Sequence, residues 1–195
     1  DSAPLARQLA PRLCRKAPIT GEDCAWIHGL WQHLRLLGLA STPDYHRAFF
    51  AHALQSVVGV KGAPRILVSG AADYSMFALV VQAFRELKIR PEVTVVDQCE
   101  TPLMLSRWYA ERCAFAVTTH RSDITEFTGS HAYDALCTHS FFSEFAPERR
   151  PGILARWKQL LRPGGAAIIV NRVRPGSRPG PVTVTTEQAQ GFGAA

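Results

Sequence analysis

The sequence of 195 residues has no apolar run that approaches the roughly 18 residues of a membrane-spanning helix, so we expect no membrane partner. Its proline and glycine residues show no collagen-like period, and no internal repeat occurs. Hydrophobic residues make up 47% and charged residues 19% of the chain, which excludes wholesale disorder. The length is sufficient for one domain with a hydrophobic core, with room for a small appendage.

Cysteine motifs are also lacking. No C-x-x-C occurs, the cysteine count is odd, and the spacings match no zinc module. The histidine pairs His28/His33 and His46/His52 share no helix face well, so no metal site is predicted. Reduced thiols and the absence of a signal-peptide core favour a cytoplasmic protein. The cysteines are Cys14, Cys24, Cys99, Cys113 and Cys137.

Lysine is scarce, because only four lysines accompany 18 arginines in a chain of net charge +6. The arginines are spread along the whole sequence, whereas a nucleic-acid binder usually concentrates its basic residues in one stripe. We therefore expect no nucleic-acid partner. The excess of positive charge is still compatible with a small anionic substrate.

The first 60 residues show helical periodicity. Helices are predicted over 4–16, 22–37 and 42–58, the last with Thr42 as cap and Pro43 in its first position. Thr20 to Asp23 resembles a capping box for the second of these helices. We expect region 1–60 to be a helical extension that serves as a lid or as a homodimer face.

From residue 61 to 173 the pattern alternates between strands and helices. Short apolar runs at 65–69, 92–97, 114–118, 133–138 and 166–170 predict strands, the last following a break at Pro163-Gly-Gly165. Helices are predicted between them, over 73–88, 101–112 and 147–161. This order predicts an α/β fold with a doubly wound, mostly parallel sheet. Region 174–195 is predicted to be a loop and the start of an incomplete C-terminal part.

Ligands of such sheets bind at the carboxyl ends of the strands. The first strand ends in small residues around Gly70, which allow a ligand to approach the backbone before a helix begins. The second ends at Asp97, whose carboxylate can accept both hydroxyl groups of a ribose. Asp123 and Ile124 follow the third strand, and they suit the amine and the face of an adenine. Thr138 and His139 come at the end of the fourth strand.

Five segments in this order resemble the class I S-adenosylmethionine-dependent methyltransferases. They are ILVSGAADYSM, VTVVD, SDIT, YDALCTHSFFSEF and LLRPGGAAIIV, within about residues 60–172. The resemblance implies a Rossmann-like fold and S-adenosylmethionine as cofactor, with S-adenosylhomocysteine as product. The cofactor-binding residues that it implies are Ser69, Gly70, Ala71, Asp73, Tyr74, Asp97, Gln98, Asp123, Ile124, Thr138 and His139.

The first motif departs from the family pattern of an acid followed by G-x-G-x-G. Ser69 stands in place of the acid, only Gly70 remains of the glycines, and Asp73 is expected to replace the acid in part. The fourth strand ends in Thr-His-Ser-Phe rather than the Asn/Asp-Pro-Pro-aromatic form of many nitrogen methyltransferases. This difference favours methylation of a small molecule at oxygen.

The resemblance implies that the protein aligns an acceptor with an already electrophilic methyl group. A hydroxyl acceptor benefits from a general base, and His139 is our candidate, although it could simply contact the cofactor or pack. Tyr45, His46 and Phe142 are candidate substrate contacts, with core packing as the alternative for these aromatic positions.

Three other interpretations stay open. The altered first motif is consistent with a non-catalytic binding or assembly domain, and an RNA methyltransferase or a nicotinamide-dependent dehydrogenase would use the same sheet. The absence of G-x-G-x-x-G and the presence of LLRPGG disfavour the dehydrogenase. Because the first residue is not Met and few residues follow the fifth strand, we expect the chain to be a fragment of a longer methyltransferase.

Overall fold

A computed structural model describes residues 2–14, 23–40, 42–57, 62–128, 133–171 and 186. Its centre is a five-stranded parallel sheet with the strand order β3-β2-β1-β4-β5. The strands are β1 (Arg65–Ser69), β2 (Glu92–Asp97), β3 (Thr118–Arg121), β4 (Tyr133–His139) and β5 (Leu161–Val170). The predicted α/β class with a doubly wound parallel sheet is confirmed.

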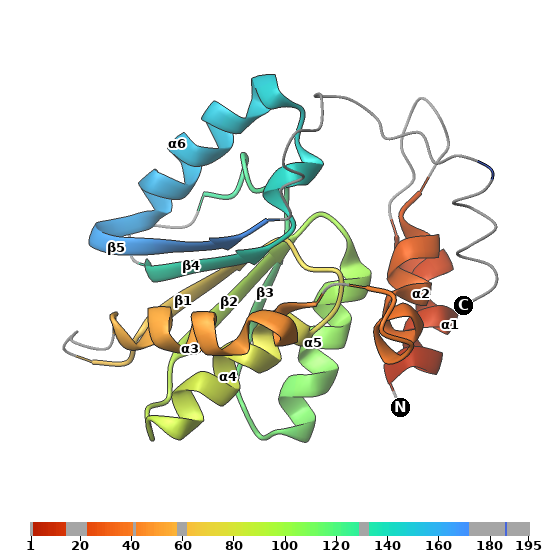
Figure 1. Cartoon of the computed structure of the whole chain (residues 1–195), viewed down its shortest axis with the longest axis horizontal. Helices are drawn as coiled ribbons and strands as arrows, with labels where there is room; N and C mark the ends of the chain where they lie inside the picture. Colours follow the sequence, from red (N-terminus) through yellow and green to blue (C-terminus); the bar gives the residue numbers. More distant parts are fainter. Residues whose placement is uncertain are drawn as a thin grey trace.

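Helices lie on both faces of the sheet and beyond one end of it (Figure 1). The α-helices are α1 (Ser2–Leu13), α2 (Ala25–Leu36), α3 (Arg47–Gln55), α4 (Ser75–Glu86), α5 (Glu100–Arg112) and α6 (Arg150–Leu160). Short 3-10 helices are η1 (Pro43–His46), η2 (Phe142–Glu144) and η3 (Pro147–Arg149). In Figure 1, α6 covers one face, α3 and α4 cover the other, and α1 and α2 lie beyond the carboxyl ends of the strands.

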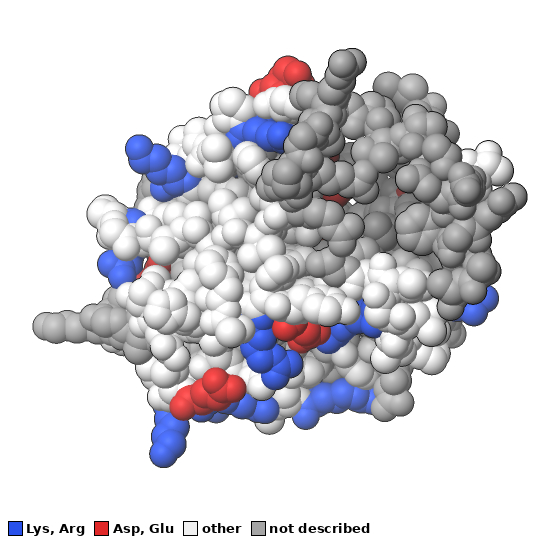
Figure 2. All heavy atoms as spheres, in the orientation of Figure 1, with Lys and Arg blue, Asp and Glu red and all other residues white. Residues whose placement is uncertain are grey.

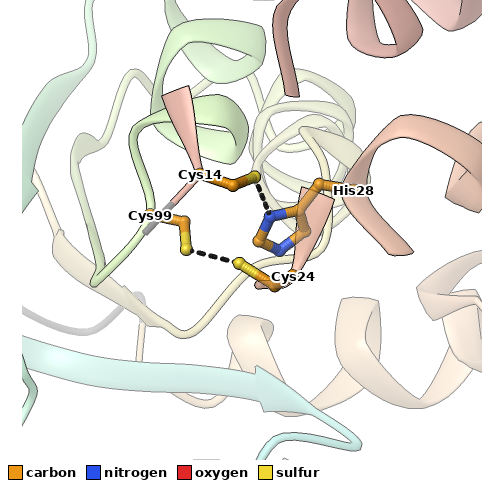
Figure 3. Close-up of side chains that lie close together, drawn as sticks. All are labelled: Cys14, Cys24, His28 and Cys99. Carbon is orange, nitrogen blue, oxygen red and sulfur yellow. Dashed lines mark hydrogen bonds between the residues drawn. The ribbon is translucent and has the colours of Figure 1, made fainter. Parts of the chain in front are cut away.

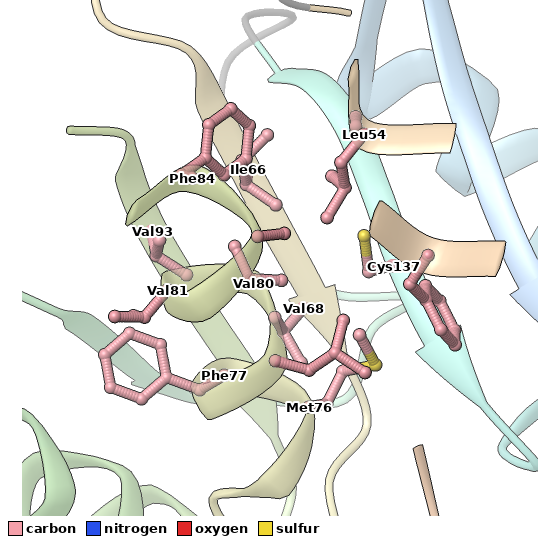
Figure 4. Packing of buried hydrophobic residues seen from close by; sticks show 14 of the residues in the cluster. Leu54, Ile66, Val68, Met76, Phe77, Val80, Val81, Phe84, Val93 and Cys137 are labelled. Carbon is pink, nitrogen blue, oxygen red and sulfur yellow. The ribbon is translucent and has the colours of Figure 1, made fainter. Parts of the chain in front are cut away.

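Alternating side chains of β1 supply both halves of the core. Ile66 and Val68 face α3 and α4, where they pack with Phe77 and Val80 in a large cluster (Figure 4). Leu67 faces α6 and packs in the second cluster. Because successive side chains of a strand point to opposite faces, Ser69 also belongs to the α6 side.

Ser69 is tied to α6 by a buried hydrogen bond. The Nε1 atom of Trp157 donates to its hydroxyl oxygen at 3.0 Å, and both side chains are fully buried. We expect Trp157→Phe to lower the free energy of unfolding by about 1–3 kcal/mol, because the Ser69 hydroxyl loses its donor. Urea denaturation measures this loss. Trp26→Phe is the control, since 65% of Trp26 is exposed, and an equal effect of the two changes would contradict the prediction.

The prediction for the third strand was wrong in position. Residues 114–117 form the turn and connection after α5 instead, because Ala114 has φ +52° and the amide of Phe115 donates to the carbonyl of Ala110, which ends the helix. The strand begins at Thr118, which pairs with Thr94 of β2. It lies at the edge of the sheet with mostly exposed side chains, so it has no apolar pattern to detect.

The predicted break at Pro163-Gly-Gly165 is part of β5. This strand starts at Leu161, directly after α6, and its register with β4 shifts between Tyr133 and Ala135. β5 is an edge strand of the described sheet, where a proline without an N–H group costs no ladder hydrogen bond.

The N-terminal helices differ from the prediction in two ways. The helix predicted over 42–58 is divided into η1 and α3, and the apolar residues of α2 do not form its buried face. The buried residues of α2 are His28, Gly29 and Gln32, whereas Trp26 and Leu36 are exposed. Thr20 of the predicted capping box lies outside the described residues, although Asp23 accepts a hydrogen bond from the amide of Ala25. Within the described part of the chain, no helix has the length and apolar character needed to cross a membrane.

Candidate functional site

The loop after β1 places Gly70 against an aromatic ring. Gly70 has φ +74°, and its amide donates to the carbonyl of Val96 at 2.9 Å. A Cβ atom at this position would lie 2.2 Å from Cδ2 of Phe141. Glycine is therefore needed for both conformation and space. The small residue expected to admit a ligand is in contact with a side chain of this protein itself.

Asp97 lies at the carboxyl end of β2 and joins two loops. One carboxylate oxygen accepts from the amide of Ala71 at 2.8 Å, and the other accepts from the amide of Cys99 at 2.7 Å. Burial raises the pKa of Asp97 to about 6, against the lowering effect of these two amides. Since each carboxylate oxygen has more than one acceptor position, both can still accept a hydroxyl group.

The residues predicted to contact adenine lie next to this end of β2. The side-chain amide of Gln98 donates to Asp123 Oδ2 at 2.9 Å, and Asp123 Oδ1 accepts from the amide of Thr125 at 2.8 Å. Gln98 and Asp123 are thus brought together. Ile124 is buried in the cluster under α6 rather than presented to a ligand.

Asp73 is held by the protein on both sides. Its Oδ1 atom accepts from the amide and the hydroxyl of Ser75, in the first turn of α4. Its Oδ2 atom lies 3.6 Å from Nη1 of Arg35, which also pairs with Asp44. No sequence motif marks Arg35, because a lone arginine on a helix has no distinguishing pattern around it. These ion pairs connect α2 and η1 to the β1–α4 loop.

The histidines at the end of β4 and in η1 are neighbours. The rings of His139 and His46 have centroids 5.4 Å apart, so η1 lies against the end of β4. Thr138 is buried, and its hydroxyl has no hydrogen-bond partner among the residues that the structure describes. Ser140 has φ +56°, which turns the chain so that Phe141 lies over Gly70.

The remaining predicted site residues are exposed or pack on neighbouring aromatic rings. Tyr45 is 66% exposed. Tyr74 stacks on Tyr109 of α5 with ring centroids 4.8 Å apart. Phe142 packs against Trp157 of α6 at 5.6 Å.

A pocket of about 680 Å³ lies between α6 and the start of β5, lined by residues that include Leu154, Lys158 and Arg162. It is at the amino end of β5, because β5 runs parallel to β4 and its residue Val170 pairs with His139. This pocket is therefore separate from the group at the carboxyl ends of the strands.

Comparisons with known proteins support the fold. No protein-family model matches the chain, and no curated protein sequence matches it. Among solved structures, it is similar to a protein from Methanococcus maripaludis classed as an S-adenosyl-L-methionine-dependent methyltransferase, with TM-score 0.55 and 11% identity over 72% of this chain and 61% of that one. A protein from Bacillus halodurans classed as a methyltransferase has TM-score 0.50 and 17% identity over 65% of this chain and 52% of that one.

A third similar structure, the 4+2 cyclase SpnF, has TM-score 0.54 and 14% identity over 71% of this chain and 51% of that one. The chain thus spans about half to three-fifths of the length of these three proteins. These similarities show that the chain has the Rossmann-like fold of these proteins, two of which are classed as methyltransferases, and this confirms the fold predicted from the sequence motifs.

The described residues fit the nucleoside part of S-adenosylmethionine. Asp97 has an acceptor position for a ribose hydroxyl, and Gln98 and Asp123 offer polar atoms beside it. The backbone of Gly70 is covered by Phe141, so the remainder of the cofactor requires this ring to move.

Proposed function

We propose that this protein binds S-adenosylmethionine at the carboxyl ends of β1, β2 and β4 and transfers the methyl group to a small molecule, at an oxygen atom. The observation that carries the proposal is the position of Asp97. It ends β2 of a class I methyltransferase fold, and its carboxylate also holds the glycine-containing loop through Ala71. When bound, S-adenosylmethionine supplies an electrophilic methyl group on sulfur.

Each residue of this site has a distinct proposed role. Asp97 accepts the ribose hydroxyl groups, and Gln98 with Asp123 contacts the adenine. His139 removes the proton of the acceptor hydroxyl. Oxygen is favoured because the fourth strand ends in Thr-His-Ser-Phe and lacks the Asn/Asp-Pro-Pro-aromatic form of many nitrogen methyltransferases. His46 lies beside it and contacts the acceptor from the N-terminal extension. That extension excludes water from the site while the reaction proceeds.

Titration calorimetry with S-adenosylmethionine and S-adenosylhomocysteine tests the proposal directly. We expect both to bind to the purified chain. Failure of either compound to bind at millimolar concentration would overturn it.

We expect the affinity for S-adenosylhomocysteine to fall as the pH is lowered through about 6. The pKa of Asp97 is near 6, and only the ionised carboxylate accepts hydrogen bonds from both hydroxyl groups. Affinity is therefore full above this pH and lost below it. Calorimetry from pH 5 to 8 measures the change, with Asp97→Asn as the control. An equally steep dependence in that variant would assign the titration to another group.

A second candidate is a ligand-binding domain of this fold that does not methylate. Two observations favour it: Phe141 covers Gly70, and the 4+2 cyclase SpnF shares the fold. Such a domain would bind S-adenosylhomocysteine or a related nucleoside and release no product when supplied with S-adenosylmethionine and candidate acceptors.

Partners other than a small molecule stay as predictions. On the face shown in Figure 2, the basic side chains are scattered and partly interleaved with acidic ones rather than gathered in one stripe. This pattern supports a small-molecule acceptor over RNA. A homodimer through the N-terminal helices and a cytoplasmic location remain predictions.

A further inference from the structure

Four side chains that are separate in the sequence meet beside the β2–α5 turn (Figure 3). Cys14 follows α1, Cys24 precedes α2, His28 lies in the first turn of α2, and Cys99 precedes α5. One ligand atom from each residue lies within 4.8 Å of the ligand atoms of the other three. Cys14 Sγ is 3.2 Å from His28 Nδ1, and Cys24 Sγ is 2.8 Å from Cys99 Sγ.

Three thiols and one imidazole are a ligand set of structural zinc sites. With Zn–S bonds of about 2.3 Å and tetrahedral angles, the sulfur atoms of such a site lie about 3.8 Å apart. The Cys24 and Cys99 sulfur atoms are 2.8 Å apart, about 1 Å closer than this, and all four ligand atoms lie within 4.8 Å of one another, so side-chain rotations would bring them onto one ion. An iron–sulfur cluster needs more space between its ligands than these atoms leave. We propose that Cys14, Cys24, His28 and Cys99 bind one zinc ion.

Two of the three cysteines stand at helix N-termini. Cys24 and Cys99 occupy the N-cap positions of α2 and α5, and neither makes a side-chain hydrogen bond to its helix. The positive ends of two helix dipoles therefore face these sulfur atoms. The hydroxyl of Thr101 lies 3.2 Å from Cys14 Sγ and can donate to it, as outer-shell groups of metal sites do.

The zinc ion would have a structural role, since four protein ligands leave no position for water or substrate. It would join the N-terminal helices to the turn that carries Asp97. The amide of Cys99 donates to the carboxylate of Asp97, so the ion would also support the proposed ribose-binding position. Because the ligands span residues 14 to 99, metal binding would add to the stability of the folded chain.

Metal analysis of the full chain tests the proposal. Purified under reducing conditions with zinc present, the protein should contain one zinc per chain. Cobalt(II) added to the metal-free protein should give the absorption bands of a tetrahedral thiolate site. A chain that retains no zinc and gives no such bands would overturn the proposal. A disulfide between Cys24 and Cys99, seen by mass spectrometry without reduction, would also overturn it.

Serine substitutions separate metal binding from helix capping. Serine is a preferred N-cap residue, so Cys99→Ser should keep or raise the melting temperature if Cys99 only caps α5. If Cys99 binds zinc, the variant should lose the metal and melt at a lower temperature. Cys24→Ser should behave likewise. Cys113→Ser is the matched control, because Cys113 is the C-cap residue of α5 and lies outside the cluster. This variant should retain the zinc. Full zinc content in the Cys24 and Cys99 variants would contradict the proposal.

Discussion

Replacing Asp97 by alanine should weaken the binding of S-adenosylhomocysteine by at least about 100-fold. Two ribose hydroxyl groups lose a charged acceptor, and each such hydrogen bond contributes about 1.5–3 kcal/mol. The substitution also removes the acceptor for the amides of Ala71 and Cys99, so the loop around Gly70 loses its support. Both effects act on ligand binding in the same direction. Titration calorimetry on the variant measures the loss.

The control for this experiment lies on the same strand. Glu92 begins β2 at the opposite end of the sheet, with an exposed side chain. Glu92→Ala removes the same charge from the chain and should leave the affinity unchanged. An unchanged affinity in Asp97→Ala, in a variant that still folds, would show that the ligand does not use this carboxylate.

Replacing Gly70 by alanine should lower the free energy of unfolding by about 2–5 kcal/mol. A positive φ costs an alanine roughly 1–2 kcal/mol. Forcing the Phe141 ring away costs about 1–3 kcal/mol more, as overpacking generally does. Urea denaturation measures the sum.

Gly38→Ala separates these two costs. Gly38 has φ +70°, close to the +74° of Gly70, but a Cβ atom there would have no neighbour within 4 Å. The Gly38→Ala variant should therefore lose only the free energy that a positive φ costs an alanine. In a Phe141→Ala background, Gly70→Ala should cost no more than Gly38→Ala, and this double-mutant cycle measures the contact itself. Equal effects of Gly70→Ala and Gly38→Ala in the native background would show that Phe141 does not occupy this space.

The elements that were predicted well are those with a buried face. β1, β2 and β4 carry continuous apolar runs because both faces of a parallel sheet are covered, and their predicted bounds differ from the structure by no more than one residue. β3 and the start of β5 were misplaced because edge strands need no such runs. The exposed apolar residues of α2 show a similar limit of sequence-based prediction. Helical periodicity reveals that a helix has an apolar face, but it does not reveal whether another element covers that face.

The candidate site was predictable where a residue ends a strand. Asp97, Thr138 and His139 are found at the expected strand ends because register and strand length are local properties. The roles of Ser69 and Asp73 were less predictable, since each is bound by a distant residue, Trp157 or Arg35. Cys24 and His28 are four residues apart on one helix, a spacing that suits two ligands, but their partners Cys14 and Cys99 have no fixed relation to them in sequence.

The sequence by itself therefore determined the fold class, the order of the strands along the chain and the acid at the end of β2. These follow from hydrophobic patterns and short motifs that act within a few residues. Only the tertiary structure decided that Phe141 covers Gly70, that His46 meets His139, and that the cysteines gather with His28. Those contacts join segments tens of residues apart. The first depends on how the turn after β4 lies over the loop after β1, and the other two depend on how the N-terminal helices dock against the end of the sheet.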